Sequence, residues 1–214
     1  KSNITLYARW SPIIYYIKFS PGTGGTGTMS TMTLKYTEEK NLIANAFTRT
    51  GYSFNGWSGS NGRTYANNAS VYNLSTTHGA TITLTAQWKS NDYTVELNGN
   101  GATSTTHTKS ITPKFDSAMP SITIPSREYT VSFNKNGGTV SSSSLVSNYK
   151  FEGYYYDSTQ YYTSTGSSAR NWDKASAVTL DASWSGGAIT LPNATREGYL
   201  LEGWYTAASG GTKV

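Results

Sequence analysis

The sequence predicts a mainly β chain of tandem small modules with little helix, because two strand patterns recur along it. The first pattern stands at Gly51–Trp57 (GYSFNGW) and Gly198–Trp204 (GYLLEGW), with a weaker copy at Asn148–Tyr154 (NYKFEGY). In each copy large apolar residues alternate with small or polar ones, which is the period of a half-buried strand. Repeated use of one strand pattern indicates repeated structural units.

The second pattern is a shorter strand that would close each unit. It stands at Thr5–Trp10 (TLYARW), Thr83–Trp88 (TLTAQW) and Thr179–Trp184 (TLDASW). Each copy places Leu, Ala and Trp on one face of a strand. The spacing of the two patterns is kept, since 31 positions separate Trp57 from Trp88 and 30 separate Tyr154 from Trp184. The two patterns therefore belong to one module.

The openings outnumber the complete modules. The front half Tyr16–Arg49 begins with an alternating strand and a glycine-rich turn, and similar openings start at Tyr93 and Tyr129. In one parsing, Tyr93–Arg127 is a second front half, Tyr129–Ser147 is an inserted hairpin, and the back half resumes at Tyr149. In the other, the stretch up to Ser126 is a linker and a shortened module starts at Tyr129. Matching length favours the first parsing.

The predicted organisation has four parts. Residues 1–10 are the closing strand of a preceding repeat, 11–90 the first module, 91–185 a second, variant module with an inserted hairpin near 129–147, and 186–214 the start of a further, incomplete module. The chain opens on lysine without a charged and apolar leader, so we expect it to be an internal piece of a longer protein.

The best helix candidate is Glu38–Phe47, which has glutamates near its start. It offers about three turns, and isolated helices of that length are marginal. We therefore expect either one helical turn or a strand that leads into Gly51.

Composition excludes several classes of site and of partner. The 214 residues include no cysteine, which removes disulfides, zinc–thiolate sites and cysteine nucleophiles. No apolar run is long enough to span a membrane. The net charge of +5 comes from scattered residues, which favours an ordinary solvated surface over a nucleic-acid interface. Tyrosine and tryptophan are abundant, at 17 and 6 residues, and can build small cores.

Together the two strand patterns and the opening Tyr129–Gly138 (YTVSFNKNGG) resemble the Listeria–Bacteroides repeat, the B-repeat module of internalin-type bacterial surface proteins. The resemblance implies small β-grasp-like modules in an elongated arrangement along a secreted or wall-attached protein. It implies a non-catalytic role as a stalk, spacer or adhesion unit, without a cofactor, metal or inserted membrane segment. Neighbouring repeats and a surface glycan or protein are the expected partners. The middle module departs from the pattern, with Asn148 and Tyr154 in place of Gly51 and Trp57.

The motif tryptophans invite a sugar-stacking hypothesis, but their fixed positions favour core packing. They are Trp10, Trp57, Trp88, Trp184 and Trp204. What recurs in tandem units is usually what each unit needs in order to fold. The repeated glycine before the motif aromatic fits the same interpretation, because a missing side chain beside a large ring permits close packing or a bulge.

The candidate ligand site is a tyrosine cluster at a place where the copies of the repeat differ. Its members are Tyr155, Tyr156, Tyr161 and Tyr162. Adjacent strand residues point to opposite faces, so both faces can be apolar only if the sheet is covered. The alternatives are an exposed patch that binds glycan or protein, and packing against the insertion or a neighbouring module. A carbohydrate-binding module that uses these tyrosines is thus the alternative function.

Catalytic signals are weak. His78 and His107 lie outside any motif, and we expect both to be solvent-exposed. The twelve acidic residues are dispersed, although a paired carboxylate could still make the chain part of a wall-acting hydrolase, the second alternative. The segments Gly22–Gly27 and Asn98–Gly101 are interpreted as turns rather than a phosphate loop or a calcium site.

Overall fold

The computed structural model describes residues 3–214 and divides them into two compact units. Unit 1 runs to Asp92 and includes Lys114–Asp116 and Asp173–Ala175. Unit 2 comprises Tyr93–Pro113, Ser117–Trp172 and Ser176–Val214. No helix occurs among the described residues, and the mainly β prediction with several small sheets in repeat modules is confirmed.

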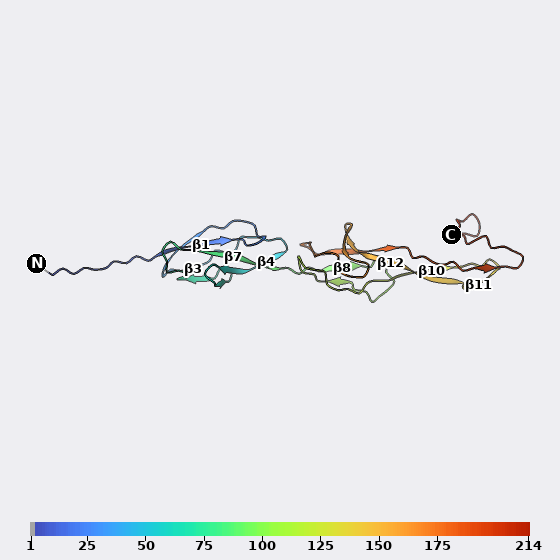
Figure 1. Cartoon of the computed structure of the whole chain (residues 1–214), viewed down its shortest axis with the longest axis horizontal. Helices are drawn as coiled ribbons and strands as arrows, with labels where there is room; N and C mark the ends of the chain where they lie inside the picture. Colours follow the sequence, from blue (N-terminus) through green and yellow to red (C-terminus); the bar gives the residue numbers. More distant parts are fainter. Residues whose placement is uncertain (1–2) are drawn as a thin grey trace. The chain divides into compact units, whose positions relative to one another are not determined.

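Unit 1 is built on a five-stranded mixed sheet with the order β2-β1-β7-β4-β5 (Figure 1). Its strands are β1 (Ile14–Ser20), β2 (Met32–Lys35), β4 (Tyr52–Gly59), β5 (Thr64–Tyr65) and β7 (Thr81–Ser90). β1 and β7 are parallel, and the other pairs are antiparallel. The closing strand β7 is therefore central, with the opening strand on one side and the Gly-Tyr motif strand on the other.

The helix alternative for Glu38–Phe47 is wrong, because the segment is extended. β3 (Glu39–Asn41) pairs with β6 (Ser70–Tyr72) in a two-stranded sheet. The Asn45 side chain accepts from the Phe47 N–H and donates to the Phe47 carbonyl. Such local bonds compete with a helix ladder. Extension also places both Leu42 and Phe47 in the core.

The core of unit 1 surrounds Trp57, which is 1% exposed. Its ring centroid lies 4.8 Å from that of Phe54, 5.0 Å from Phe19 and 6.1 Å from Phe47. The alternation on β1 and β7 adds Tyr15, Ile17, Ile82, Leu84 and Ala86 to this core. The first repeated motif is thus the packing centre of its unit.

Unit 2 repeats the same strand order within a larger sheet. Its strands are β8 (Val95–Asn98), β9 (Ser110–Ile111), β10 (Arg127–Ser132), β12 (Ser144–Tyr156), β13 (Thr159–Tyr162) and β14 (Val178–Ser185). The path β9-β8-β14-β12-β13 matches β2-β1-β7-β4-β5, including the parallel pair of β8 and β14. The long strand β12 uses its second half in this path and pairs through its first half with β10.

A further part of unit 2 lies beyond β10. β11 (Thr139–Val140) pairs with β15 (Ala194–Thr195), so Thr139 lies opposite Thr195. Unit 1 has an equivalent bridge between Thr26 and Thr48. The Phe133 and Trp204 ring centroids are 4.8 Å apart. This contact reproduces the Phe19–Trp57 contact of unit 1.

The segment before β1 forms no strand, although its sequence carries the closing pattern (Figure 1). The large apolar side chains within residues 4–10 are Ile4, Leu6, Tyr7 and Trp10, and all are at least 81% exposed. Trp10 is therefore not in a core, contrary to the expectation for the motif tryptophans. The physical reason is that no described strand is hydrogen-bonded to this segment.

Candidate functional site

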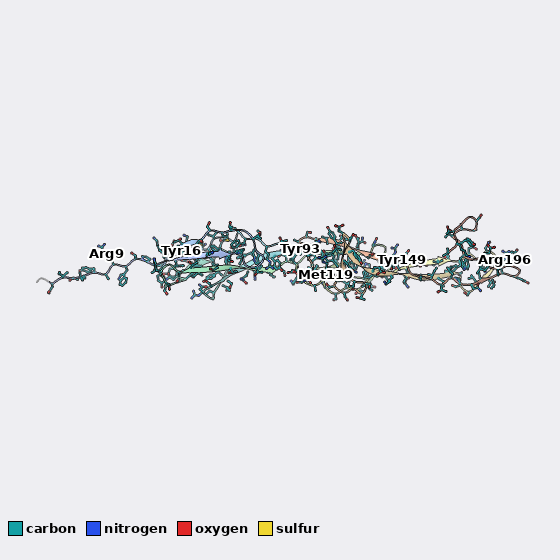
Figure 2. The ribbon with its side chains drawn as sticks, turned by 45° about the horizontal axis from the view of Figure 1, so that its top comes forward. Arg9, Tyr16, Tyr93, Met119, Tyr149 and Arg196 are labelled. Atoms are coloured by element: carbon teal, nitrogen blue, oxygen red, sulfur yellow. The ribbon has the colours of Figure 1, made fainter. Side chains whose placement is uncertain are left out.

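The three copies share an arrangement that we call the arginine–tyrosine clamp. An arginine lies over a tyrosine ring, with its guanidinium carbon 3.6 Å from the centroid for Arg49 and Tyr52, 4.5 Å for Arg127 and Tyr149, and 4.1 Å for Arg196 and Tyr199. The same arginines lie beside Gly24, Gly101 and Gly137, the left-handed glycines of the opening turns. Tyr149 and Arg196 are labelled in Figure 2. The clamp joins each opening turn to its Gly-Tyr motif.

The middle clamp explains how the inserted segment is accommodated. Arg127 and Tyr149 are 22 positions apart, whereas the other two clamps join residues three positions apart. Sequence reasoning missed this site, although an arginine three residues before the motif tyrosine in both intact copies was an available signal. A cation–π contact at an exposed site stabilises a fold by about 0.5–1 kcal/mol. We therefore interpret the clamp as a structural element.

The closing-strand tryptophans make a second structural contact, a hydrogen bond to the opening turn. The Nε1 of Trp88 donates to the Pro21 carbonyl at 2.9 Å, and that of Trp184 donates to the Gly99 carbonyl at 3.2 Å. Both acceptors lie in the opening turn of the same module. These side chains are half-buried and pack against their cores, which accords with packing rather than sugar stacking.

Two of the four candidate tyrosines are buried. Tyr161 and Tyr162 are both 0% exposed, as is neighbouring Tyr154. The Tyr161 ring lies 5.3 Å from that of Trp172, and the Tyr162 hydroxyl donates to the Pro120 carbonyl at 2.7 Å. The rings of Tyr161 and Tyr162 have no face open to a ligand, so these two residues pack inside the unit instead of forming an exposed patch.

Both faces of this hairpin are apolar because a loop covers it. Trp172 donates its backbone N–H to the Ser117 carbonyl, and Met119 donates its own to the Ser168 hydroxyl. These bonds hold Met119 and Trp172 against the hairpin. Burial raises the pKa of Tyr154 to about 12 and raises that of Tyr162 as well. Trp172 lies outside both repeated patterns and was not predicted as a core residue.

The other two candidate tyrosines lie nearer to solvent. Tyr155 is half-buried, and Tyr156 is 37% exposed at the end of β12. The next two residues, Asp157 and Ser158, have positive φ and turn the chain into β13. Tyr156 is therefore the candidate that presents the most surface.

The potential acid–base groups serve local structure. The Nδ1 of exposed His78 accepts from the Ile14 N–H at 3.3 Å, and half-buried His107 lies 2.9 Å from the Ser104 carbonyl. Hydrogen bonds from Ser185 and from Lys150 lower the pKa of Glu152. Within residues 3–214 no three His, Asp or Glu side chains gather as a metal site.

A hollow of about 640 Å³ lies beside the β4–β5 hairpin. Phe54, Trp57, Tyr65 and Gln87 are among the residues that line it. The lining holds no carboxylate and no histidine, so it offers no group for acid–base chemistry near neutral pH.

Comparison with known families agrees with this repeat architecture. Residues 15–92 match the divergent InlB B-repeat domain, and residues 161–214 match the Listeria-Bacteroides repeat domain. No curated protein and no solved structure matches the chain. Both families are typical of bacterial surface proteins, and the described residues include no helix that could cross a membrane. The chain therefore carries a divergent InlB B-repeat domain and a Listeria-Bacteroides repeat domain.

Proposed function

We propose that the chain is a non-catalytic, extracellular repeat region of a bacterial surface protein, and that it acts as a stalk or spacer. The observation that carries the proposal is the use of the recurring residues. In the first module the clamp arginine Arg49, the motif aromatic Trp57 and the closing-strand Trp88 each contact a partner within residues 11–90. Because these recurring residues serve packing, the proposed role depends on the geometry of the chain rather than on a binding or catalytic residue. The bounds 11–90 and 91–185 for its modules belong to this proposal.

The strand order of unit 1 supports a role under tension. The opening strand β1 and the closing strand β7 are parallel neighbours, with five residues of each in register from Tyr16–Ser20 and Thr81–Thr85. A force applied at the two ends of the module pulls these strands along their axes in opposite directions. The hydrogen bonds between them are therefore loaded together rather than one at a time.

A single-molecule pulling experiment tests this role. Handles attached at Ser11→Cys and Ser90→Cys load β1 and β7 in shear, whereas handles at Ser11→Cys and Lys35→Cys open the antiparallel β1–β2 pair from its end. We expect a clearly higher unfolding force for the first geometry. Equal forces in the two geometries would count against the spacer proposal.

A second candidate function is glycan binding through Tyr155 and Tyr156. The observation in its favour is that Tyr156 is 37% exposed beside a tight turn. Aromatic faces of this kind can stack on sugars. On a glycan array, Tyr156→Ala should lose binding, while the control Tyr72→Ala, at a ring that is 52% exposed on β6, should keep it. If both variants keep their glycan binding, this candidate function is removed.

A further inference from the structure

We propose that the hollow beside the β4–β5 hairpin of unit 1 is a binding site for a neutral saccharide. The hollow measures about 640 Å³, which lies within the roughly 300–1,000 Å³ of typical small-molecule sites. All of its lining residues belong to unit 1. The site is distinct from Tyr155 and Tyr156 in unit 2, and it goes beyond the stalk role, which would stand without it.

A β-bulge shapes one wall of the hollow. The register of β4 against β7 shifts between Phe54 and Trp57, so that Asn55 and Gly56 together lie opposite Gln87. Gly56 has a φ of +98°, a conformation that favours glycine. A bulge bends its strand and interrupts the regular ladder. The bulge therefore places two amide side chains, those of Asn55 and Gln87, on the wall of one hollow.

The early end of β5 leaves the other side open. β5 comprises only Thr64 and Tyr65, and it pairs with β4 at two positions, Trp57 and Ser58. The chain then continues through residues 66–67, which are exposed and also line the hollow. Among the described strands, none lies beside β4 on this side next to the bulge. The hollow thus occupies the place that a longer β5 would cover.

Unit 2 fills the equivalent place with one of its own side chains. The Gln160 Nε2 donates to the Glu152 carbonyl at 3.1 Å. A methyl group placed on Gly153, the equivalent of Gly56, would meet the Gln160 side chain. A methyl group on Gly56 would meet only the Tyr65 carbonyl group apart from its chain neighbours. The module fold therefore does not require an open hollow at this position.

The tyrosines on the short strands show the same difference. Tyr65 on β5 and Tyr162 on β13 occupy equivalent positions. Tyr162 is 0% exposed, and its hydroxyl donates to the Pro120 carbonyl. Tyr65 is half-buried, and its hydroxyl accepts from the Asn61 Nδ2 at 2.7 Å. A hydroxyl that accepts keeps its own proton, so Tyr65 offers a donor that Tyr162 has already used.

The amides of the lining supply a further donor and an acceptor. The Asn67 Oδ1 accepts from the Asn45 N–H at 2.9 Å, so its Nδ2 is left to donate to a ligand. The Gln87 Nε2 donates to the Thr85 carbonyl at 3.3 Å, so its Oε1 is left to accept. Sugar hydroxyls both donate and accept, and they can use both kinds of group.

The rest of the lining favours an uncharged ligand with apolar faces. The half-buried rings of Phe54 and Tyr65 border the hollow, and such rings pack against the C–H faces of sugars. No lining residue carries a charge, so the site offers no counterion for an anionic or cationic ligand. An added peptide strand is disfavoured because the bulge at Gly56 interrupts the ladder that such a strand would extend. A neutral saccharide satisfies both the rings and the amides.

A glycan array probed with the full chain identifies the ligand class. We expect binding to neutral glycans, and raising NaCl from about 0.05 M to about 0.5 M should change it by less than about twofold, because uncharged contacts are not screened. Adding a bound neutral glycan to the isotope-labelled chain should shift the amide signals of Gly56, Thr64 and Ala66 in nuclear magnetic resonance spectra.

Variants on the exposed lining test the site without touching the core. Gln87→Ala should weaken neutral-glycan binding roughly two- to tenfold, the usual effect of one lost hydrogen bond. Ala66→Trp should abolish binding because the ring fills the hollow. The matched control Lys89→Ala lies on the same strand outside the lining and should bind as the wild type does. Thermal unfolding confirms that each variant is folded.

Several results would overturn the proposal. One is the absence of binding to every neutral glycan, including the case in which only acidic glycans or extended peptides bind. Another is binding that both Gln87→Ala and Ala66→Trp keep. Binding that Tyr156→Ala abolishes, while Gln87→Ala retains it, would place the glycan in unit 2 and exclude the hollow.

Discussion

Replacement of Trp57 separates the packing role of this residue from its polar atom. The side chain is 1% exposed and contacts three phenylalanine rings. Trp57→Ala should destabilise unit 1 by about 3–5 kcal/mol, the usual cost of removing a buried aromatic side chain. That amount is a large fraction of the roughly 5–15 kcal/mol that stabilises a typical domain.

Trp57→Phe should behave very differently. The smaller ring keeps an aromatic contact with Phe19 and Phe54 but leaves a cavity that costs about 1 kcal/mol. The Trp57 Nε1 is buried without a hydrogen-bond partner among the described residues. Removing such a donor also removes its desolvation penalty, which raises the unfolding free energy by about 1–3 kcal/mol. The two effects offset each other, so the unfolding free energy should stay within about 1 kcal/mol of the wild type.

Urea unfolding followed by circular dichroism measures the two free energies, and hydrogen exchange assigns them to a unit. In Trp57→Ala the amides of Ile17 and Leu84 should lose protection, while those of Leu97 and Leu180 in unit 2 should keep it. A Trp57→Phe variant as unstable as Trp57→Ala would refute the account of the indole nitrogen. Equal loss of protection in unit 2 would refute the assignment of Trp57 to one core.

Three further variants test the backbone, the clamp and a buried phenol. Gly153→Ala should destabilise unit 2 by more than about 1 kcal/mol in thermal unfolding, because φ is +138° and a methyl group would collide with the Tyr162 carbonyl, whereas Gly79→Ala at an open position should cost about 1 kcal/mol or less. Arg49→Gln should cost about 0.5–1 kcal/mol through loss of the cation–π contact. The pKa of Tyr154, raised to about 12, exceeds its unfolded value of about 10, so the stability of unit 2 should hold below pH ~10 and fall as the pH rises toward 12. In a pH series Tyr154→Phe should flatten that fall.

The sequence predicted those parts of the fold that depend on alternation and spacing. The constant distance between the two strand patterns arises because Trp57 and Ala86 must lie opposite each other on β4 and β7. The spacing of unit 2 follows in the same way from Tyr154 and Ala182. Strand periodicity cannot specify a partner, so the assignment of Thr5–Trp10 to a preceding repeat stays a prediction.

The candidate site was harder to predict because it depends on residues outside the repeated patterns. Burial of Tyr161 and Tyr162 requires the loop at Met119 and Trp172, which the chain brings over the hairpin from two distant segments. Register shifts along β12, near Gly153, also change which side chains face inward. Alternation rules count residues on a regular strand and therefore fail at such shifts.

The position of the closing strand makes each module an all-or-none assembly. β1 and β4 do not pair with each other, since β7 lies between them and is the last of these strands to occur in the sequence. A fragment that spans residues 11–89 retains β7 almost entirely and should give a β-type circular dichroism spectrum with cooperative unfolding. A fragment that spans 11–79 lacks only that strand and should be largely unfolded, because Ile82, Leu84 and Ala86 leave the core together. A folded 11–79 fragment, or an unfolded 11–89 fragment, would contradict the central role of β7.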